Sequence, residues 1–501
     1  MTPPSDDSAA PPATEEYPRK WFAFTAIAIS FVTMVMSISM VFVALSAIAE
    51  DFDITLRAVT WVVIAQALTI SALMMPMGRL ADIIGWKRVH LIGLVLFAAG
   101  SVIVAFAPAF SIVIAGRVVM AIGNAMGQSV GTAMIVAIFP ASERGNAIGS
   151  QTTAVAIGGA SGPIIGGLLL QILPWEALFL ILVVPIAIAF VAGSIILDDA
   201  RLQPDRAGSR PPFDWWGAVL SGMAIVLVVI TINNPLAVSW GSPLMLGSIG
   251  SALLLFTAFV RWELRTPSPM LDLTLFKNAV FSLAVVTRFM GFMGTTATRF
   301  LMPIYLISVR GLEEGAAGAV LFLISFGMGI AAQGSGRLSD RFGPRPFSVI
   351  GFSVLAVTSL PMAFLTQVTP MSIVMVLLFL NGFGMGLWNV PNNSVIMGSV
   401  PPTRLGVVSA LANLTRNVGN VIGQAVASGV IVAVMVANGF DIPLNEVSEV
   451  AGAGEAFIDG WRIAYYLVTG YAVIGLLLAI VTKPPFERPS AARPVAVARA
   501  R

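Results

Sequence analysis

The chain has 501 residues, of which 57% are hydrophobic and 11% charged, and its mean hydropathy is +0.91. Soluble domains carry about 25% charged residues, so this composition excludes a soluble globular protein and predicts an integral membrane protein. The absence of cysteine excludes disulfides and thiol catalysis, and a single histidine argues against a histidine-built metal site or triad. We therefore expect no metal, no cofactor and no nucleic-acid partner.

Apolar runs of about 20 residues recur along the whole chain and are separated by short polar breaks. They predict an all-α integral membrane protein whose partner is the lipid bilayer. Its fourteen transmembrane helices are expected near 21–49, 58–77, 88–107, 110–137, 146–172, 176–197, 215–234, 242–262, 279–308, 316–333, 346–366, 371–398, 404–436 and 462–482.

Lysine and arginine are unevenly divided between alternate loops. With both termini cytoplasmic, the outer loops hold only Arg57, Arg310 and Arg462, and the other loop and tail cations lie inside. Removing any one span would invert every later loop, so the asymmetry supports fourteen. Arginine far exceeds lysine, which is typical of a GC-rich bacterial genome, so we expect a multi-pass protein of a bacterial inner membrane. The sequence does not fix the oligomeric state, and a monomer is compatible with it.

An eight-residue segment occurs twice. Gly78-Arg-Leu-Ala-Asp82-Ile-Ile-Gly85 recurs as Gly336-Arg-Leu-Ser-Asp340-Arg-Phe-Gly343 at a constant offset of 258 residues. The same offset relates the starts of the first and ninth predicted helices. Parallel halves around a midplane site are an architecture of secondary transporters. The expected division is a disordered tail 1–20, a six-helix bundle 21–198, a linker with two extra helices 199–278, a second six-helix bundle 279–483 and a disordered tail 484–501.

Each copy of the repeat is expected in the inner loop that follows the second helix of its half. Glycine there permits a tight turn and close helix approach. The aspartate can accept hydrogen bonds from a helix N-terminus or pair with an arginine.

The two copies resemble the signature loop of the major facilitator superfamily. Arg117, in Gly116-Arg117-x5-Gly123, resembles the fourth-helix basic motif, and Gly158-Gly-Ala-Ser-Gly162-Pro163-Ile-Ile-Gly166-Gly167 matches the fifth-helix antiporter motif GxxxGPxxGG. With fourteen spans and Leu414-Thr-Arg416-Asn-Val-Gly419, residues 21–483 resemble the fourteen-helix drug/proton antiporter family. The resemblance implies export of drugs or small organic compounds by alternating access, in exchange for protons. It assigns conformational gating to Gly78, Asp82, Gly85, Arg117, Gly158, Gly162, Pro163, Gly166, Gly336, Asp340 and Arg416.

The first helix departs from that family. Ser37, Phe42 and Ser46 stand where the family has Asp, Asn and Pro. Every Asp and Glu falls in a loop, a tail or a helix end, so no midplane carboxylate is available to carry a proton or to pair with a cation. A helix-end acid such as Glu176 or Asp82, or the substrate itself, would then carry the proton.

Four arginines do lie inside predicted spans: Arg117, Arg288, Arg299 and Arg416. Each costs at least about 2.5–3.5 kcal/mol at a helix centre, so each should face protein or water, with carbonyls, amides or hydroxyls as partners. Arg288 and Arg299 share one face of the ninth helix. Two interpretations of Arg288 stand, a packed residue and a contact for an anionic substrate, whereas Arg299 is expected to extend to the outer interface.

The twelfth helix carries amides around Trp388 and Pro391. An interrupted helix lined by amides, with an aromatic ring beside it, suits an amphipathic ligand, although hydrogen bonds between helices also account for such amides. The expected substrate contacts are Arg288, Gln66, Asn124, Trp388, Asn389 and Asn392.

The sequence leaves three functions open, none of them enzymatic. The first is proton-coupled export of amphipathic compounds, and the second is transport of an anionic metabolite or lipid-like anion by the intramembrane arginines. The third is a non-transporting scaffold or sensor, against which both signature copies and the complete fifth-helix motif argue. No Gly-x4-Gly-Lys-Ser/Thr loop is present, so ATP-driven transport by this chain is excluded.

Overall fold

The computed structural model describes residues 17, 19–203, 212–233, 242–440, 442, 447, 450 and 452–484. Within these residues every regular element is helical, and fourteen helices are long and apolar enough to cross a membrane. The prediction of an all-α chain with fourteen spans is therefore confirmed.

The helices fall into three groups along the chain. The first half comprises α1 (Lys20–Asp51), α3 (Trp61–Ile84), α4 (Trp86–Ala105), α5 (Phe110–Ile138), α6 (Arg144–Leu170) and α7 (Glu176–Ile196). The inserted pair is α9 (Trp215–Asn233) and α10 (Pro243–Glu263). The second half comprises α11 (Ala279–Ile304), α12 (Glu314–Phe342), α13 (Pro344–Met362), α14 (Met371–Gly398), α15 (Leu405–Ala437) and α16 (Ala453–Val481). Short helices α2 (Leu56–Val59) and α8 (Asp199–Leu202) lie in connections of the first half.

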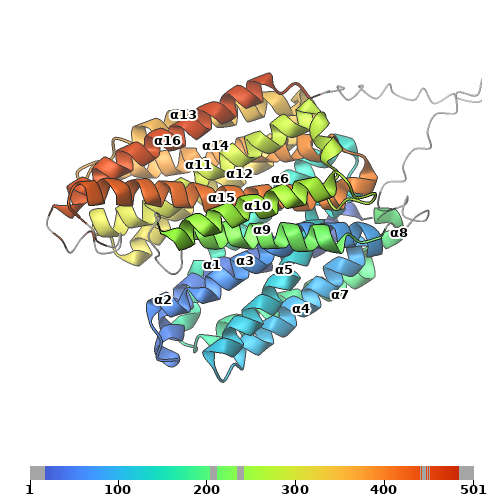
Figure 1. The fold of residues 1–501 in the computed structure, drawn as a ribbon, viewed down its shortest axis with the longest axis horizontal. Coiled ribbons are helices and arrows are strands. Elements are labelled where there is room, and N and C mark those ends of the chain that lie inside the picture. The colour runs from blue at the N-terminus through green and yellow to red at the C-terminus, as the bar shows by residue number, and fades with distance from the viewer. Residues whose placement is uncertain are drawn as a thin grey trace, which may run out of the picture.

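The two halves pack in corresponding ways. In the first half α4 packs on α5, and in the second α13 packs on α14. Between the halves, α6 lies against α12 and α3 lies against α15. The inserted helices α9 and α10 pack on each other, and α9 also contacts both α3 and α15. Figure 1 shows the blue and cyan first half below the yellow to red second half, with the green inserted pair in front of both.

Within the described residues, the large apolar cluster that spans both halves lies at one end. We call the end that holds Gly78–Gly85 and Gly336–Gly343 the signature end, and the opposite one the far end. At the signature end a single apolar cluster joins Met74 and Val130 of the first half to Val285 and Leu411 of the second. At the far end each half has its own cluster, around Trp175 in one and around Trp461 in the other. The halves accordingly converge toward the right of Figure 1 and diverge toward the left.

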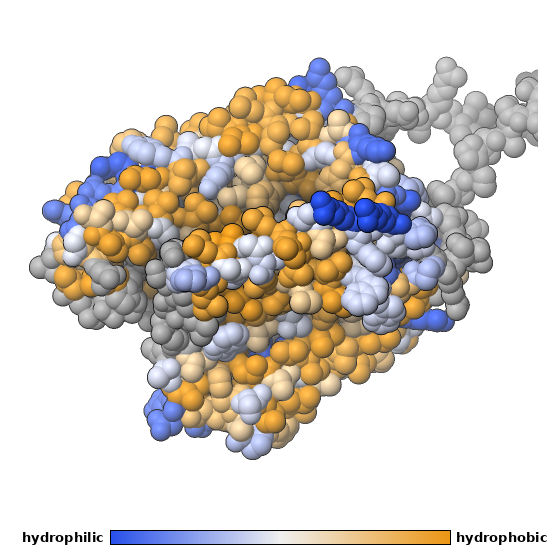
Figure 2. Space-filling model, in the orientation of Figure 1, coloured by the Kyte–Doolittle hydropathy of each residue, from blue (hydrophilic) through white to orange (hydrophobic). Residues whose placement is uncertain are grey.

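The flank of the bundle is apolar. Large side chains such as Ile195 and Val357 are more than two-thirds exposed, at 77% and 71%. Figure 2 shows hydrophobic residues over most of the visible flank and hydrophilic residues gathered toward the ends of the helices. A continuous apolar exterior of this kind is stable only when lipid replaces water around it.

The two signature copies are helical, so their predicted placement in loops is wrong. Helix α3 continues through Ile84 and α12 through Phe342, and each ends at a glycine with positive φ, 114° at Gly85 and 88° at Gly343. Residues such as arginine, leucine and alanine favour a helix, whereas a positive φ is readily adopted only by glycine. The motifs therefore form the last turns of α3 and α12.

Two further boundaries differ from the prediction. Helix α14 runs unbroken from Met371 to Gly398 through Pro391, so the predicted interruption is wrong, because packed neighbours satisfy the backbone groups that proline frees in a membrane helix. Helix α16 begins at Ala453, which places Arg462 inside a helix and not in an outer loop.

The predicted tails 1–20 and 484–501 lie outside the described residues except at their inner ends. There, Tyr17 Oη donates to Ile196 O at 3.0 Å and accepts from Asp198 N at 2.9 Å, and Lys20 begins α1. The first of these segments is therefore attached to the end of α7 before the first membrane helix starts.

Candidate functional site

Asp340 of α12 caps a helix of the other half. Its carboxylate accepts hydrogen bonds from Gly145 N at 2.7 Å and from Asn146 N at 2.9 Å, in the first turn of α6. The first N–H groups of a helix have no partner within the helix, and the helix dipole favours a negative charge there. Asp340 thus joins the two halves at the signature end.

Asp82 of α3 repeats this arrangement with the halves exchanged. Its Oδ2 accepts from Val407 N at 3.1 Å, at the start of α15, and its Oδ1 accepts from Trp86 Nε1 at 2.8 Å. Because the two copies of the motif each cap a helix of the opposite half, the signature end is closed by a pseudo-symmetric pair of contacts.

Glycines make this closure possible. A Cβ on Gly78 would lie 2.5 Å from Ala410 Cβ, and one on Gly336 would overlap Gly145 O. By contrast, the antiporter-motif glycines Gly158 and Gly166 face α1 of their own half, where a Cβ would lie 2.5 Å from Val32 O and 2.8 Å from Met40 Cγ. Gly162, next to Pro163, faces the same helix at Met36 and Met40. The motif therefore packs two helices within the first half.

A polar seam continues the contact between α6 and α12. Gln333 Nε2 and Arg337 Nε both donate to Asn146 Oδ1 at 3.1 Å, and Thr153 Oγ1 donates to Gly329 O at 3.1 Å. On α6 and α12, hydrogen bonds between described residues of the two halves reach no further than this last pair. Closure thus extends from the signature end to about the middle of these helices.

A second set of contacts joins α5 to α15. Arg416 Nη2 donates to Gln128 Oε1 at 2.6 Å, and Asn413 Nδ2 donates to Gln128 O at 2.9 Å. Gln128 in turn donates to Asn124 Oδ1 one turn earlier on α5. One glutamine side chain therefore links the polar face of the first half to a cation of the second.

Arg288 of α11 lies beside this set and is 4% exposed. Its Nε donates to Ala412 O at 2.8 Å and its Nη1 donates to Asn389 Oδ1 at 3.1 Å, while its guanidinium lies 5.0 Å from the centre of the Phe292 ring. These partners hold the guanidinium in place, but none of them carries a negative charge.

Arg299 lies further along α11, toward the far end. Its Nη2 lies 3.6 Å from the sulfur atoms of Met328 and Met385, two buried residues that share a cluster with Ala156 of the first half. The Arg299 residue itself is exposed. Because its partners belong to α12 and α14 and their cluster reaches α6, the side chain faces the space between the halves. Its expected extension to the outer interface stays a prediction.

Arg288, Arg299 and Arg416 form one positive cluster. Arg416 interacts electrostatically with each of the other two, and the interactions are repulsive. Within the described part of the chain no salt bridge pairs any of them with a carboxylate. Of the three, Arg288 is buried, and a buried cation without a counter-charge is costly, so a ligand that brings negative charge or strong acceptors is favoured there.

The structure brings together only some of the predicted substrate contacts. Asn389 bonds to Arg288 directly, and Asn124 is connected to Arg416 through Gln128. Gln66 instead accepts from Arg117 Nη2 within the first half, and Arg117 Nε also donates to Val62 O at 3.3 Å.

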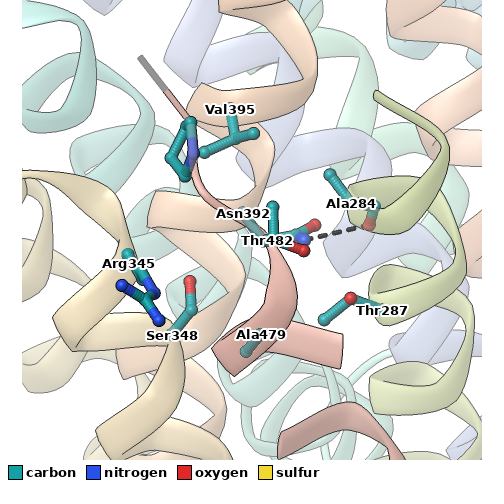
Figure 3. A pocket seen from close by; sticks show the side chains of 9 residues that line it. Ala284, Thr287, Arg345, Ser348, Asn392, Val395, Ala479 and Thr482 are labelled. Carbon is teal, nitrogen blue, oxygen red and sulfur yellow. Dashed lines mark hydrogen bonds between the residues drawn. The ribbon is translucent and has the colours of Figure 1, made fainter. Parts of the chain in front are cut away.

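Trp388 and Asn392 also point elsewhere. The Trp388 ring is fully buried between Phe292 and Phe352, with ring centres 5.3 and 5.0 Å away. Asn392 Nδ2 donates to Ala284 O at 2.9 Å, beside a recess that lies within the second half (Figure 3). The expected place of Trp388 in a cavity depended on an interruption of its helix, and α14 is continuous.

Sequence reasoning left Gln128 out of the predicted contacts. Its spacing of four residues from Asn124 places both amides on one face of α5, and this spacing is the sequence feature that could have identified Gln128. Its bond to Arg416, 288 residues away in sequence, depends on the packing of the two halves.

Comparison with known proteins places these features in context. A model of the Major Facilitator Superfamily matches residues 26–424. The riboflavin transporter RibZ of Clostridioides difficile is 28% identical over 92% of this chain and 97% of its own length. The tetracenomycin C resistance and export protein of Streptomyces glaucescens is 30% identical over 86% of this chain and 79% of its own. The structure of human organic anion transporter MFSD10 shares the fold, with a TM-score of 0.65 and 15% identity over 92% of this chain and all of that one.

Proposed function

The chain belongs to the Major Facilitator Superfamily, and from this premise we propose that it exports amphipathic organic compounds from a bacterial cytoplasm by alternating access. The rocking units would be residues 21–198 and 279–483, connected by residues 199–278. Two relatives that match most of the chain are named as a riboflavin transporter and as a tetracenomycin C export protein, and both of these names describe movement of organic compounds.

The conformation fits an alternating-access cycle. The excess of arginine and lysine in the signature-end connections assigns this end to the cytoplasm. Here the signature end is closed by Asp82 and Asp340, whereas the far end has separate cores in the two halves. This is the arrangement of a state open toward the outside, from which an exporter would release its substrate.

The arginine cluster carries our proposal for substrate class. Among the described residues, Arg288, Arg299 and Arg416 are three cations without a carboxylate partner, and the apolar side chains of Phe292, Met328 and Met385 pack beside them. A substrate with an anionic or strongly accepting group on an apolar body complements both features. We therefore place the compound class closer to organic anions than to lipophilic cations.

The family resemblance implies exchange for protons, but the proton would have to be carried without a carboxylate at the membrane midplane. Among the described residues, every Asp and Glu lies in a connection or within the first or last two turns of its helix. The proton would then be carried by a helix-end acid or by the acidic group of the substrate, and not by a midplane carboxylate.

Flux in proteoliposomes tests the substrate class. We would compare a fluorescent organic anion with a lipophilic cation of matched size, with and without a pH gradient, in wild type and in Arg299→Met. Methionine matches the apolar surroundings of Arg299 and removes the charge. We expect the anion to be the better substrate and its transport to fall about tenfold or more in the variant, because a charge-assisted contact contributes about 1.5–3 kcal/mol.

Arg462→Gln is the matched control, since the Arg462 side chain is partly exposed and pairs with Asp459 at 3.6 Å, one turn away on α16. Its anion transport should equal that of wild type. Preferential cation transport that is unaffected by Arg299→Met would refute the proposed substrate class, and no flux of either probe would refute the transport function for these compounds.

A further inference from the structure

The inserted helix pair carries two buried carboxylates at the signature end. Asp214 directly precedes α9 and is 7% exposed, and Glu263 is the last residue of α10 and is 4% exposed. Neither belongs to the six-helix halves, and neither takes part in the capping contacts of Asp82 and Asp340. Buried acidic side chains are rare unless they are paired or have a function.

Both oxygens of Asp214 have a hydrogen-bond partner, whereas one oxygen of Glu263 has none within the described residues. Asp214 Oδ1 accepts from Gly217 N at 2.9 Å, and Trp262 Nε1 lies 2.9 and 3.1 Å from its two oxygens. Glu263 Oε2 accepts from Leu271 N at 3.0 Å. The other oxygen, Glu263 Oε1, is buried and has no hydrogen-bond partner within the described part of the chain.

The unpartnered oxygen of Glu263 lies close to Asp214. A Cβ placed on Gly217 would overlap both Glu263 Oε1 and Asp214 Oδ2, so the two oxygens flank one point that only a glycine leaves open. Two ionised carboxylates side by side repel each other in a buried site, and one proton between them removes the repulsion and satisfies both oxygens.

The cationic side chains around the pair do not neutralise it in place of that proton. Arg79 of α3 interacts electrostatically with Glu263, and it interacts with Asp82 on the same helix as well. Arg261 and Arg265 are exposed, and Arg404 is engaged with Asp272. Arg79 is therefore shared between Glu263 and Asp82, and it does not neutralise both carboxylates of the pair.

Direct contacts connect the pair to the closure of the signature end. Glu263 holds Leu271, and the next residue, Asp272, forms an ion pair with Arg404 immediately before α15. The first turn of α15 contains Val407, whose N–H is capped by Asp82. A change of charge at Glu263 thus acts on the segment that positions α15 and, through Arg79, on Asp82.

We propose that Asp214 and Glu263 form a proton-binding site that holds one shared proton while the signature end is closed. The proton is exchanged with the solution at that end. Its loss leaves two adjacent negative charges, whose repulsion pushes Glu263, and with it the attached segment around Leu271, away from Asp214 and favours opening. Cytoplasmic pH then regulates the transporter, with alkaline pH favouring the open signature end. The inference rests on alternating access as proposed above, but not on the identity of the substrate.

The absence of cysteine from the chain permits a direct test. Spin labels at Arg88→Cys and Arg341→Cys would report the separation of the two halves at the signature end, since both side chains are exposed there. The purified full-length protein, in lipid nanodiscs and without substrate, would be measured by pulsed electron resonance over a range of pH. We expect the open-to-closed ratio to rise with pH, by up to about tenfold per pH unit for one linked proton.

Glu263→Gln keeps the shape and removes the titration, so its ratio should change less than about twofold over the same range. Asp198→Asn, an exposed acid at the same end, is the control and should respond as wild type does. An unchanged separation in wild type, or a full pH response in Glu263→Gln, would overturn the inference.

Infrared titration of wild type supplies a second measurement that does not depend on a variant. The carbonyl band of a protonated carboxylic acid should disappear on alkalinisation and should be missing from both Glu263→Gln and Asp214→Asn. Its persistence in both variants would also overturn the inference. Because neither experiment uses a substrate, failure of the organic-anion proposal in flux assays would leave this outcome unaffected.

Discussion

Arg416 of α15 donates a hydrogen bond to Oε1 of Gln128 on α5, 2.6 Å away, and thereby joins the two halves through a cation that has no carboxylate partner in the described part of the chain. An anionic group that binds Arg416 must compete with the weaker, neutral acceptor Gln128. Substrate binding would therefore loosen one contact between the halves as it forms another. This relationship connects the proposed substrate class to the conformational change.

Arg416→Gln should weaken binding of an organic anion about tenfold or more and leave a neutral analogue of the same shape within about threefold. The reason is that a hydrogen bond to a charged group contributes about 1.5–3 kcal/mol, whereas a neutral one contributes about 1 kcal/mol. Binding measured by tryptophan quenching or calorimetry on purified protein would show the difference. Equal losses for the anion and the neutral analogue would contradict a role of the charge.

Gln128→Glu is the complementary change. The new carboxylate would pair with Arg416, cancel one positive charge of the cluster and strengthen the contact between the halves. We expect anion transport to fall and the preference for cations to rise, measured as the ratio of the two fluxes. A variant with an unchanged ratio would show that Arg416 does not contact the charge of the substrate.

Asp340→Asn should impair transport without preventing folding. The asparagine can still accept one hydrogen bond from Gly145 N or Asn146 N, but the interaction of the carboxylate charge with the start of α6 is lost. We expect a transport rate reduced about tenfold at normal expression and a larger population with the signature end open. Asp82→Asn, which affects the contact with Val407 N, should behave alike. Wild-type flux in both variants would defeat the assigned gating role.

Gly336→Ala tests whether close contact at the signature end is required. Its Cβ would overlap Gly145 O, so α6 and α12 must separate before the alanine fits. Gly334→Ala, one half-turn earlier on α12, meets nothing within 4 Å and should even favour the helix by up to about 1 kcal/mol. Melting temperatures and spin-label distances should shift in the first variant only. Equal shifts in the two variants would contradict the claim that Gly336 is needed for close contact at the signature end.

The pair of Asp272 and Arg404 makes a prediction about acid pH. Partial burial raises the pKa of Asp272, but hydrogen bonds from Thr274 and Arg404 outweigh it, and the net pKa lies below its ordinary value of 3.8. The contact therefore stabilises the folded state above pH 3.8, and this contribution is lost as the pH falls through the lowered pKa.

Asp272→Asn should accordingly lower the free energy of unfolding by about 1 kcal/mol or less at neutral pH, as expected for a largely solvated ion pair. The difference from wild type should shrink on acidification below pH 3.8. Thermal unfolding in detergent at a series of pH values measures it. A difference that grows in acid would contradict the assigned sign.

The membrane character, the fourteen spans and the duplication follow from local properties of the chain. Hydrophobic runs of spanning length identify the helices because a backbone in lipid must satisfy its hydrogen bonds internally, as a helix does. The repeated motif at a fixed offset identified Asp82 and Asp340 as equivalent, and the expectation that each would accept from a helix N-terminus agrees with the bonds to Val407 and Gly145. These features depend on composition and short-range pattern, so a single sequence reveals them.

The tertiary structure decided which polar groups meet. Gln66, Trp388 and Asn392 were as polar or aromatic in the sequence as Asn389, yet they face other helices within their own halves. The contact of Gln128 with Arg416 and the meeting of Asp214 with Glu263 arise from helix rotation and from the placement of the inserted pair. No periodicity encodes these pairings, because a helix buried in a bundle of apolar helices in lipid has little hydrophobic asymmetry to fix its rotation, and side-chain packing alone sets it.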